Sequence, residues 1–340
     1  MKEFYQKAMY GIWRRGETVT YARNGENDLA ITVSMNDSSV TFDAKLYLPN
    51  PENAAKYPSG CPFIVCMHPI MPQELALSEG YALIVLNTYQ LASDDCKHNG
   101  LFYELYPYGA DDCEQTGVLM AWAWGCSKVL DAVYNGLGAE VGLDPDASIV
   151  TGVSRWGKAT AVCGAFDERF RLTMPTCSGA GGLALYQVQS EGKTYDLTKV
   201  GGPADYVYGK NEPLDCLQSE AERGWFNDQF LTYKKPEDIP YDQENLPVLA
   251  ASKDRYYFIV GACMGEDWVN APSMFECYQR ANLVYEKLGL SNHLIAHFHK
   301  EGHAVIEEDL KLLIQYFNTK YYGMDTGLDM AKLKPQVYPM

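Results

Sequence analysis

The stretch Ser148-Ile149-Val150-Thr151-Gly152-Val153-Ser154-Arg155-Trp156-Gly157-Lys158 decides how this sequence is interpreted. Its first four residues form a short strand-like run, and the small residues that follow would let the chain turn sharply into a helix. Ser154 then lies at the turn, with its hydroxyl near the free N–H groups that begin the helix. The common form of this turn is G-x-S-x-G, whereas here Gly157 comes one residue later. By itself the stretch fits either a serine nucleophile or an ordinary turn between a strand and a helix.

Apolar runs on either side of this stretch predict the other strands of a buried sheet. Short runs rich in β-branched residues are typical of strands that are covered on both faces. They lie at residues 62–67, 82–86, 256–260 and 293–298. Stretches with apolar residues at helical spacing lie between or after them, at residues 116–134, 158–166, 273–288 and 305–321. Strands that alternate with helices imply βαβ units, and therefore an α/β fold: a three-layer αβα sandwich with a mostly parallel central sheet.

Two parts of the chain depart from this alternation. Residues 29–35 and 40–48 alternate in polarity on either side of a polar turn, which predicts an antiparallel hairpin at a sheet edge. Residues 183–247 are polar, rich in turn residues and without periodicity. We expect this second segment to be a loop-rich insertion that forms a substrate wall, within a single domain that spans residues 1–340.

The composition excludes several classes of function. The 340 residues include 28 Lys and Arg against 44 Asp and Glu, which gives a net charge of −16. Nucleic-acid binding needs a dense basic surface, so we expect no nucleic-acid partner. The sequence has no apolar run long enough to span a membrane and no visible signal peptide, so we expect no membrane partner. The chain as written then fits a cytoplasmic location, or a secreted one if a signal peptide has been removed.

A serine nucleophile needs a histidine as its base and a carboxylate that orients this histidine. His303 follows the strand-like residues 293–298 and precedes a helix, which places it on a loop at the end of the last strand. Glu266 and Asp267 follow the strand before that, and both fit the position of the acid. Placement favours Asp267, with Glu266 as the alternative, and one of the two could instead cap the helix that follows.

The remaining histidines and the cysteines give weaker signals. His293, His297 and His299 alternate along a predicted strand, where a metal cluster is conceivable but ordinary strand residues are the simpler interpretation. None of the ten cysteines forms a C-x-x-C pair, which favours buried thiols over a zinc site. His68 ends an early strand, where the backbone of an oxyanion hole lies in many proteins with this serine turn. We therefore expect no metal and no cofactor.

Several motifs resemble those of carbohydrate esterase family 15, the glucuronoyl esterases. The segment from Thr151 to Lys158 resembles the family's G-x-S-R-x-G-K signature. Further similar stretches occur in the same order, and they are Phe102-Tyr103-Glu104-Leu105-Tyr106-Pro107, Ala121-Trp122-Ala123-Trp124-Gly125, Gly164-Ala165-Phe166-Asp167-Glu168-Arg169, Ser178-Gly179-Ala180-Gly181-Gly182, Gly224-Trp225-Phe226 and Glu301-Gly302-His303. The resemblance implies an α/β-hydrolase fold. It also implies hydrolysis of the ester between 4-O-methyl-glucuronic acid on xylan and lignin alcohols.

The same resemblance implies roles for individual residues. Ser154 would be the nucleophile, His303 the base, and Arg155 a group that helps to hold the oxyanion. The residues that would bind the sugar of a glucuronate-bearing carbohydrate ester are Lys158, Glu222, Trp268 and, with variable spacing, Gln218. Simple packing is the alternative for Trp268, and a solvated helix position is the alternative for Lys158.

One departure from the family concerns the acid. Fungal members place it just before the S-G-x-G-G stretch, where this chain has Cys177, and a thiol does not orient an imidazolium as a carboxylate does. Many bacterial members use an acid after the later strand, which Asp267 would supply. Two other functions stay open at this point. One is an acetylxylan or other carbohydrate esterase of the same fold, and the other is a carbohydrate-binding relative without activity.

Overall fold

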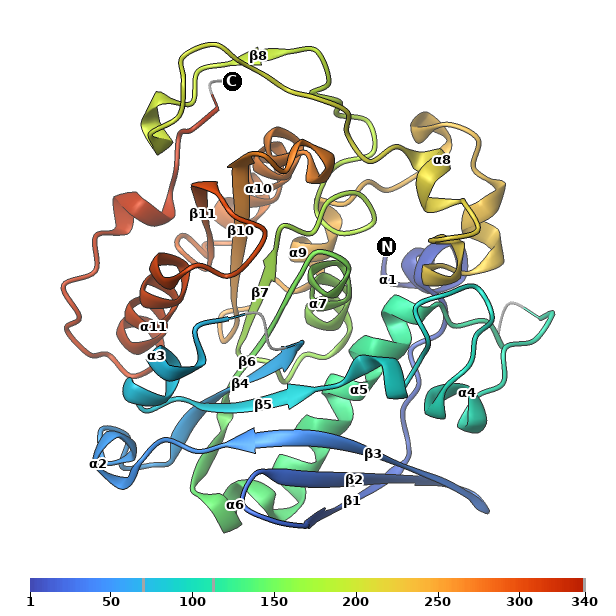
Figure 1. Ribbon diagram of the computed structural model, residues 1–340, viewed down its shortest axis with the longest axis vertical. Helices are drawn as coiled ribbons and strands as arrows, with labels where there is room; N and C mark the ends of the chain where they lie inside the picture. Colours follow the sequence, from blue (N-terminus) through green and yellow to red (C-terminus); the bar gives the residue numbers. More distant parts are fainter. Residues whose placement is uncertain (69–70, 112–113, 339–340) are drawn as a thin grey trace.

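The computed structural model describes residues 1–68, 71–111 and 114–338. A nine-stranded sheet runs through it in the order β1-β2-β3-β5-β4-β6-β7-β10-β11 (Figure 1). These strands are β1 (Thr18–Arg23), β2 (Asp28–Met35), β3 (Ser38–Tyr47), β4 (Cys61–Met67), β5 (Ala82–Leu86), β6 (Leu143–Val153), β7 (Leu172–Thr176), β10 (Tyr256–Met264) and β11 (Leu294–Glu301). Neighbours from β5 to β11 are parallel, whereas β1, β2 and β3 pair antiparallel. The predicted mostly parallel sheet with antiparallel N-terminal strands is thereby confirmed.

Helices cover both faces of the sheet, which explains why its central strands are so apolar. Every residue of β4 is buried. Residues of α5 (Val118–Ala132), α7 (Arg155–Phe166) and α10 (Ala271–Lys287) join the core on one face, and residues of α3 (Gln73–Ser78) and α11 (Glu307–Tyr321) join the core on the other. The shorter helices are α1 (Lys2–Tyr5), α2 (Pro51–Ala54), α4 (Leu101–Leu105), α6 (Gly138–Val141), α8 (Leu214–Leu217) and α9 (Asn245–Leu249). The three-layer sandwich is therefore present as predicted.

The sequence reasoning missed two strands of the nine-stranded sheet, β1 and β7. β1 is an edge strand with mostly exposed, polar residues, so it lacks the apolar run that marks the others. β7 is buried and central, but it is short and contains Pro175, which pairs with Gly152 of β6. Proline cannot donate to a ladder and usually argues against a central strand. The missing β7 matters, because it lies between the strand that precedes Ser154 and the strands that precede the acid and the base.

The segment 183–247 contains short elements, as the lack of periodicity indicated. Its strands are β8 (Thr194–Tyr195) and β9 (Tyr206–Val207), which form a small antiparallel ribbon. This ribbon crosses the top of the molecule in Figure 1, above α10. Backbone hydrogen bonds tie the segment to the loop after β10, since the amide of Glu212 donates to the carbonyl of Trp268 at 2.9 Å.

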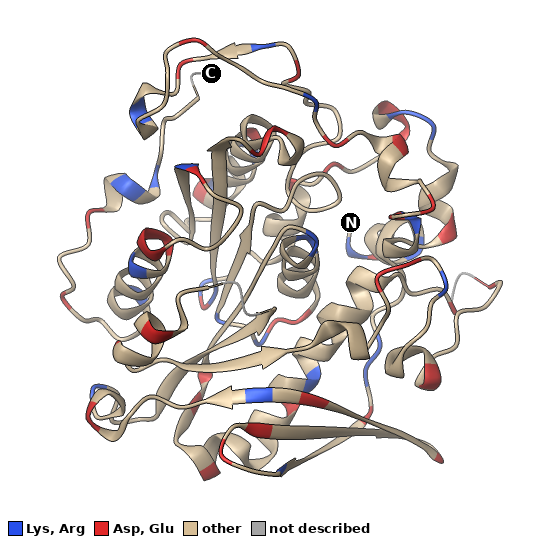
Figure 2. Cartoon of the chain, in the orientation of Figure 1, with Lys and Arg blue, Asp and Glu red and all other residues tan. Residues whose placement is uncertain are grey.

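Charged residues are distributed around the described chain without separation of the two signs (Figure 2). The helices in the described ranges are too short or too polar for any of them to cross a bilayer.

Candidate active site

The strand β6 ends at Val153, and Ser154 then turns the chain into α7. Ser154 has φ 62° and ψ −127°, a conformation that residues with a side chain rarely adopt. Its amide donates to the carbonyl of Thr176 at 3.0 Å, and its carbonyl accepts from the amide of Lys158 at 2.9 Å. A strained serine at a strand–helix turn is the geometry of a nucleophile elbow.

The late glycine of this turn has a structural cause. A Cβ atom on Gly157 would lie 2.5 Å from the carbonyl oxygen of Thr176 on β7. A Cβ atom on Gly152 would lie 2.7 Å from the carbonyl oxygen of Trp156. Both glycines are therefore required by close backbone approach, and the G-x-S-x-x-G spacing reflects how tightly α7 packs against β7.

His303 meets Glu266 because their strands are paired. Met264 at the end of β10 lies opposite Glu301 at the end of β11, so both loops leave the sheet at the same place. The Nδ1 atom of His303 lies 3.0 Å from Oε2 of Glu266. The two side chains are 34% and 29% exposed. Nδ1 is shielded from solvent and its approach to Glu266 departs from hydrogen-bond geometry, so the pair is close but imperfectly aligned.

Asp267, the acid that placement favoured, is directed elsewhere. Its carboxylate accepts a hydrogen bond from the hydroxyl of Tyr206 and another from the amide of Gly209, each at 2.8 Å. Its carbonyl accepts from the side-chain amide of Asn211 at 2.8 Å. Asp267 therefore fastens the inserted segment to the loop after β10, and among the described contacts it is Glu266 that lies against His303. The sequence could not separate two adjacent carboxylates, because their directions depend on a single turn of 3-10 helix that begins at Asp267.

Cys177 follows β7 and is buried. It cannot replace the carboxylate that orients the histidine of a triad. Its amide donates to the carbonyl of Val260 at 2.9 Å. Burial raises the pKa of its thiol, and the charges of Asp309 and Glu266 raise it further. The thiol is therefore neutral and unsuited to hold an imidazolium.

Arg155 at the start of α7 is held by Asp94, which the sequence reasoning did not identify, and by Trp225. Its guanidinium pairs with the carboxylate of Asp94 and lies 5.5 Å from the centre of the Trp225 ring. The indole of Trp225 donates to the other oxygen of Asp94 at 2.7 Å. Burial would lower the pKa of Arg155, but the hydrogen bond and charge of Asp94 raise it overall. A cation oriented in this way next to Ser154 can stabilise negative charge that develops there.

Lys158 is buried and paired with a carboxylate that the sequence analysis missed. Its Nζ donates to Oε2 of Glu212 at 2.7 Å and to the carbonyl of Ala180 at 2.6 Å. The same Glu212 oxygen accepts from the amide of Ala180 at 3.0 Å. The solvated position considered for Lys158 is thus not observed, since its side chain is only 4% exposed. Glu212 lies in the segment without periodicity, where no sequence pattern marks it.

The other expected sugar-binding residues have different surroundings. The Oε2 atom of Glu222 is shielded from solvent and has no hydrogen bond of good geometry within the described residues, and the carboxylate interacts with the thiol of Cys216. Burial, followed by the charge of Glu212, raises the pKa of Glu222. Trp268 is 37% exposed, and the Nζ of Lys210 lies 5.7 Å from the centre of its ring. Gln218 is occupied within the insertion instead, because its amide donates to the carbonyls of Phe230 and Tyr233 at 2.9 Å each.

Ser154 and His303 follow β6 and β11, which are parallel strands separated by β7 and β10. Their loops therefore leave from the same edge of the sheet. No hydrogen bond between the two side chains is among the contacts of the described residues. Catalytic hydrogen bonds are often long without substrate and shorten when it binds.

His68 follows β4, which is the parallel neighbour of β6, so it lies at the same edge of the sheet as Ser154. His68 has φ 103° and stacks on Trp156 with ring centres 4.3 Å apart, while the residues directly after it lie outside the described ranges. Within the described residues, no group of His, Cys, Asp and Glu is arranged to hold a metal ion.

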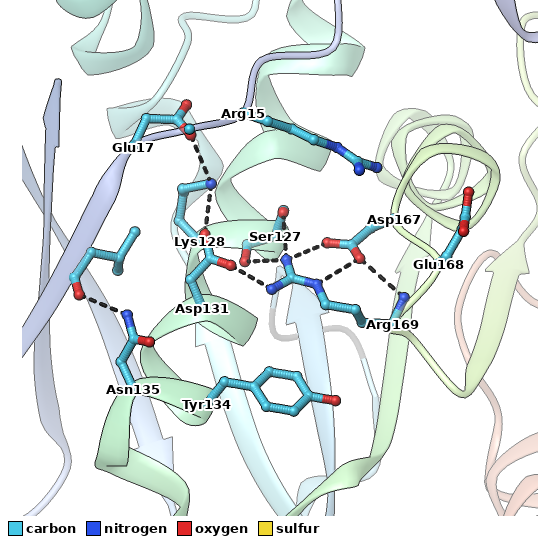
Figure 3. Close-up of a pocket in the computed structure, with 12 residues that line it drawn as sticks. Arg15, Glu17, Ser127, Lys128, Asp131, Tyr134, Asn135, Asp167, Glu168 and Arg169 are labelled. Carbon is cyan, nitrogen blue, oxygen red and sulfur yellow. Dashed lines mark hydrogen bonds and ion pairs between the residues drawn. The ribbon is translucent and has the colours of Figure 1, made fainter.

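A cavity of about 510 Å³ lies beyond the other end of α7 and is lined by charged side chains (Figure 3). Lys128 bridges Glu17 at 3.1 Å and Asp131 at 2.6 Å, and Arg169 bridges Asp131 and Asp167. These charges satisfy one another. The network therefore joins the N-terminal segment to α5 and to the end of α7 as a structural element.

The sheet, its helices and the serine elbow define the class of this protein: it is an α/β-hydrolase. The family model described as glucuronyl esterase, fungi, matches residues 31–289. The chain belongs to the glucuronoyl esterase family.

Individual relatives agree with this membership. A multidomain esterase of Ruminococcus flavefaciens is 44% identical over 99% of this chain and 44% of its own length. A 4-O-methyl-glucuronoyl methylesterase of Hypocrea jecorina is 29% identical over 86% of this chain and 58% of its own length. This chain thus spans about half the length of these two curated relatives.

Among solved structures, a carbohydrate esterase family 15 glucuronoyl esterase from Caldicellulosiruptor kristjansonii has a TM-score of 0.88 and 34% identity. The match covers 100% of this chain and 89% of that chain.

Proposed function

We propose that the protein is a serine carboxylesterase that hydrolyses esters of glucuronic acid or its 4-O-methyl derivative. The observation that carries the proposal is the strained Ser154 at the start of α7, together with the His303–Glu266 pair at 3.0 Å on the same edge of the sheet. Two relatives are named 4-O-methyl-glucuronoyl methylesterase, and these names support glucuronate esters as the substrate class. Esters that join glucuronoxylan to lignin alcohols belong to this class.

The proposed mechanism is acyl transfer in two steps. The hydroxyl oxygen of Ser154 attacks the C6 carbonyl carbon of the uronate ester while His303 accepts the hydroxyl proton. Glu266 stabilises the imidazolium, and Arg155 with nearby backbone amides stabilises the oxyanion. The tetrahedral intermediate expels the alcohol, which leaves with the proton from His303. Water then attacks the acyl carbon and gives a proton to His303, and the second tetrahedral intermediate collapses to the free acid as the Ser154 oxygen leaves with that proton from His303.

We assign sugar recognition to Lys158, Glu222 and Trp268. Lys158 is fixed by Glu212 and Ala180, so one donor of its ammonium remains for a sugar hydroxyl. The shielded carboxylate of Glu222 has the thiol of Cys216 as a weak donor, and a second sugar hydroxyl would supply a stronger one. The exposed ring of Trp268 offers a flat apolar face on which a pyranose can stack. The NH2 group of Gln218 is occupied by two backbone carbonyls, so only its side-chain oxygen is left to accept from a sugar hydroxyl.

The deciding experiment compares the wild type with Ser154→Ala on benzyl glucuronate. We expect kcat to fall by at least about 1,000-fold in the variant, because the chemical step loses its nucleophile. A fluorophosphonate probe should label the wild type and not the variant. Near-full activity of Ser154→Ala would refute the proposal.

The substrate class is tested separately by comparing kcat/KM for methyl glucuronate with that for 4-nitrophenyl acetate and with release of acetate from acetylated xylan. We expect the uronate ester to be preferred, and Trp268→Ala should raise KM for it. Preference for acetyl esters would favour the acetylxylan esterase alternative, and absence of both activities and of labelling would favour a carbohydrate-binding protein.

A further inference from the structure

The alternating histidines of β11 lead to a buried cluster beneath the loop that carries His303. His293 is separate, because its Nδ1 atom contacts the carbonyl of Arg255 at 3.0 Å. His297 and His299 are two residues apart on one strand, so both point to the same face of the sheet. On that face, Asp309 in the first turn of α11 lies against both imidazoles.

Asp309 is completely buried and uses both carboxylate oxygens. Its Oδ1 atom lies 2.6 Å from Nδ1 of His297. Its Oδ2 atom accepts a hydrogen bond from the amide of Ile306 at 2.9 Å and lies 3.5 Å from Nε2 of His299. Burial lowers the pKa of His299, while the charge of Asp309 acts in the opposite direction. These contacts join the strand β11 to the beginning of α11.

The contacts span the segment that carries the proposed base. The chain leaves β11 at Glu301, passes Gly302 and His303, and enters α11 after Ile306. Gly302 has φ 117°, so the loop starts with a turn that depends on glycine. Pairing of β10 with β11 fixes the start of this loop, and the hydrogen bond from Ile306 to Asp309 fixes its end.

The cluster is also close to the acid side of the site. The buried thiol of Cys177 is within electrostatic reach of both Asp309 and Glu266. The arrangement is not a metal site, because the described residues include no such group with suitable geometry. A buried carboxylate that bonds His297 inside β11 and the amide of Ile306 at the end of the loop instead ties the end of the loop to the strand, and this limits how far the loop can move.

We propose that Asp309 is a positioning residue for the catalytic base: through His297 and the amide of Ile306 it holds the loop that keeps His303 against Glu266. This inference rests on the proposed function. It assigns a role to the histidine alternation in β11 that neither the triad nor the sugar site uses. Asp309 does not touch the substrate, so its effect must come through the placement of His303.

The test uses three variants of the full chain. Asp309→Ala removes the contacts with His297 and with the amide of Ile306. Asp309→Asn keeps an oxygen for the amide of Ile306 and an amide that can donate to His297 after that imidazole changes tautomer. Glu308→Gln is the matched control, because Glu308 is the next residue on α11, is exposed, and pairs only with Lys332 among the described ion pairs. For each variant we would measure kcat and KM on benzyl glucuronate, the rate of fluorophosphonate labelling, and the melting temperature.

For Asp309→Ala we expect kcat and the labelling rate to fall together by about 100-fold, while KM stays within about twofold, because a displacement of about 1 Å of a catalytic group has this cost. Asp309→Asn should recover kcat to within about tenfold of the wild type, and Glu308→Gln should match the wild type. If Asp309→Ala does not fold, His297→Ala breaks the same link and is expected to lower kcat in the same way.

A folded Asp309→Ala or His297→Ala protein with kcat within about twofold of the wild type would overturn the inference, even if its melting temperature is lower. So would a loss that resides in KM instead of kcat. These outcomes leave Ser154-dependent activity intact, whereas failure of the proposed function would be seen as activity that survives Ser154→Ala.

Discussion

Replacement of Glu266 by Gln removes the negative charge that lies 3.0 Å from Nδ1 of His303. In the proposed mechanism His303 becomes positively charged when it takes the proton of Ser154, so this charge stabilises the transition state more than the ground state. At 3.0 Å the attraction between unit charges is about 5 kcal/mol for an effective dielectric constant of about 20, and about 1.4 kcal/mol in water.

The exposure of the pair sets the expected magnitude between these limits. The side chains of His303 and Glu266 are 34% and 29% exposed, so solvent screens part of the attraction. An intermediate value of about 3 kcal/mol corresponds to a loss of about 100-fold in kcat. KM should change little, because Glu266 is assigned no contact with the substrate.

Asp267→Asn is the matched control for this experiment, since it makes the same change of charge one residue away. Loss of the Asp267 charge weakens the hydrogen bonds that its carboxylate accepts from Tyr206 and Gly209. We therefore expect a lower melting temperature and a higher KM, with kcat within about fivefold of the wild type. Steady-state kinetics on benzyl glucuronate separates the two variants. The reasoning is refuted if Asp267→Asn loses about 100-fold in kcat while Glu266→Gln stays close to the wild type.

Three further predictions concern stability. Because Ser154 has φ 62°, Ser154→Gly should be more stable than Ser154→Ala by about 1 kcal/mol in urea unfolding. Glu17→Gln leaves the buried Lys128 short of a partner and should cost about 3 kcal/mol at neutral pH. Burial would raise the pKa of Glu17, but hydrogen bonds and Lys128 lower it overall, so this stabilisation exists at neutral pH and is lost as the pH falls below the carboxyl range; the two proteins should therefore converge in acid. Glu222 has the opposite effect on the pH dependence of stability. Burial raises its pKa, so the folded state loses stability as the pH rises and the carboxyl group ionises. Glu222→Gln should therefore melt at a higher temperature than the wild type at pH 8, with no difference in acid.

The fold could be predicted from the sequence because its central strands are buried on both faces. Such strands must be continuous apolar runs, and β4, β5 and β10 are visible for that reason. β1 escaped detection because an edge strand buries little. β7 escaped detection because it is short and because Pro175 contradicts the expectation for a central strand.

The candidate site was predictable where it depends on strand ends and unpredictable where it depends on the insertion. Ser154 and His303 follow strands that the sequence shows, so their edge of the sheet follows from topology alone. Glu212 and Asp94 lie in loops without periodicity, and they were found only through their contacts with Lys158 and Arg155.

The position of the acid follows from the order of the strands at this edge. β7, β10 and β11 are consecutive parallel neighbours, so the residues after each of them leave the sheet side by side. A carboxylate after either β7 or β10 can therefore reach a histidine after β11 without any change in the sheet. In this chain the position after β7 is Cys177, buried and neutral, while the register of β10 with β11 brings Glu266 to His303. The charges of Asp309 and Glu266 both raise the pKa of the Cys177 thiol, so an ionised carboxylate at this position would be disfavoured by the same charges.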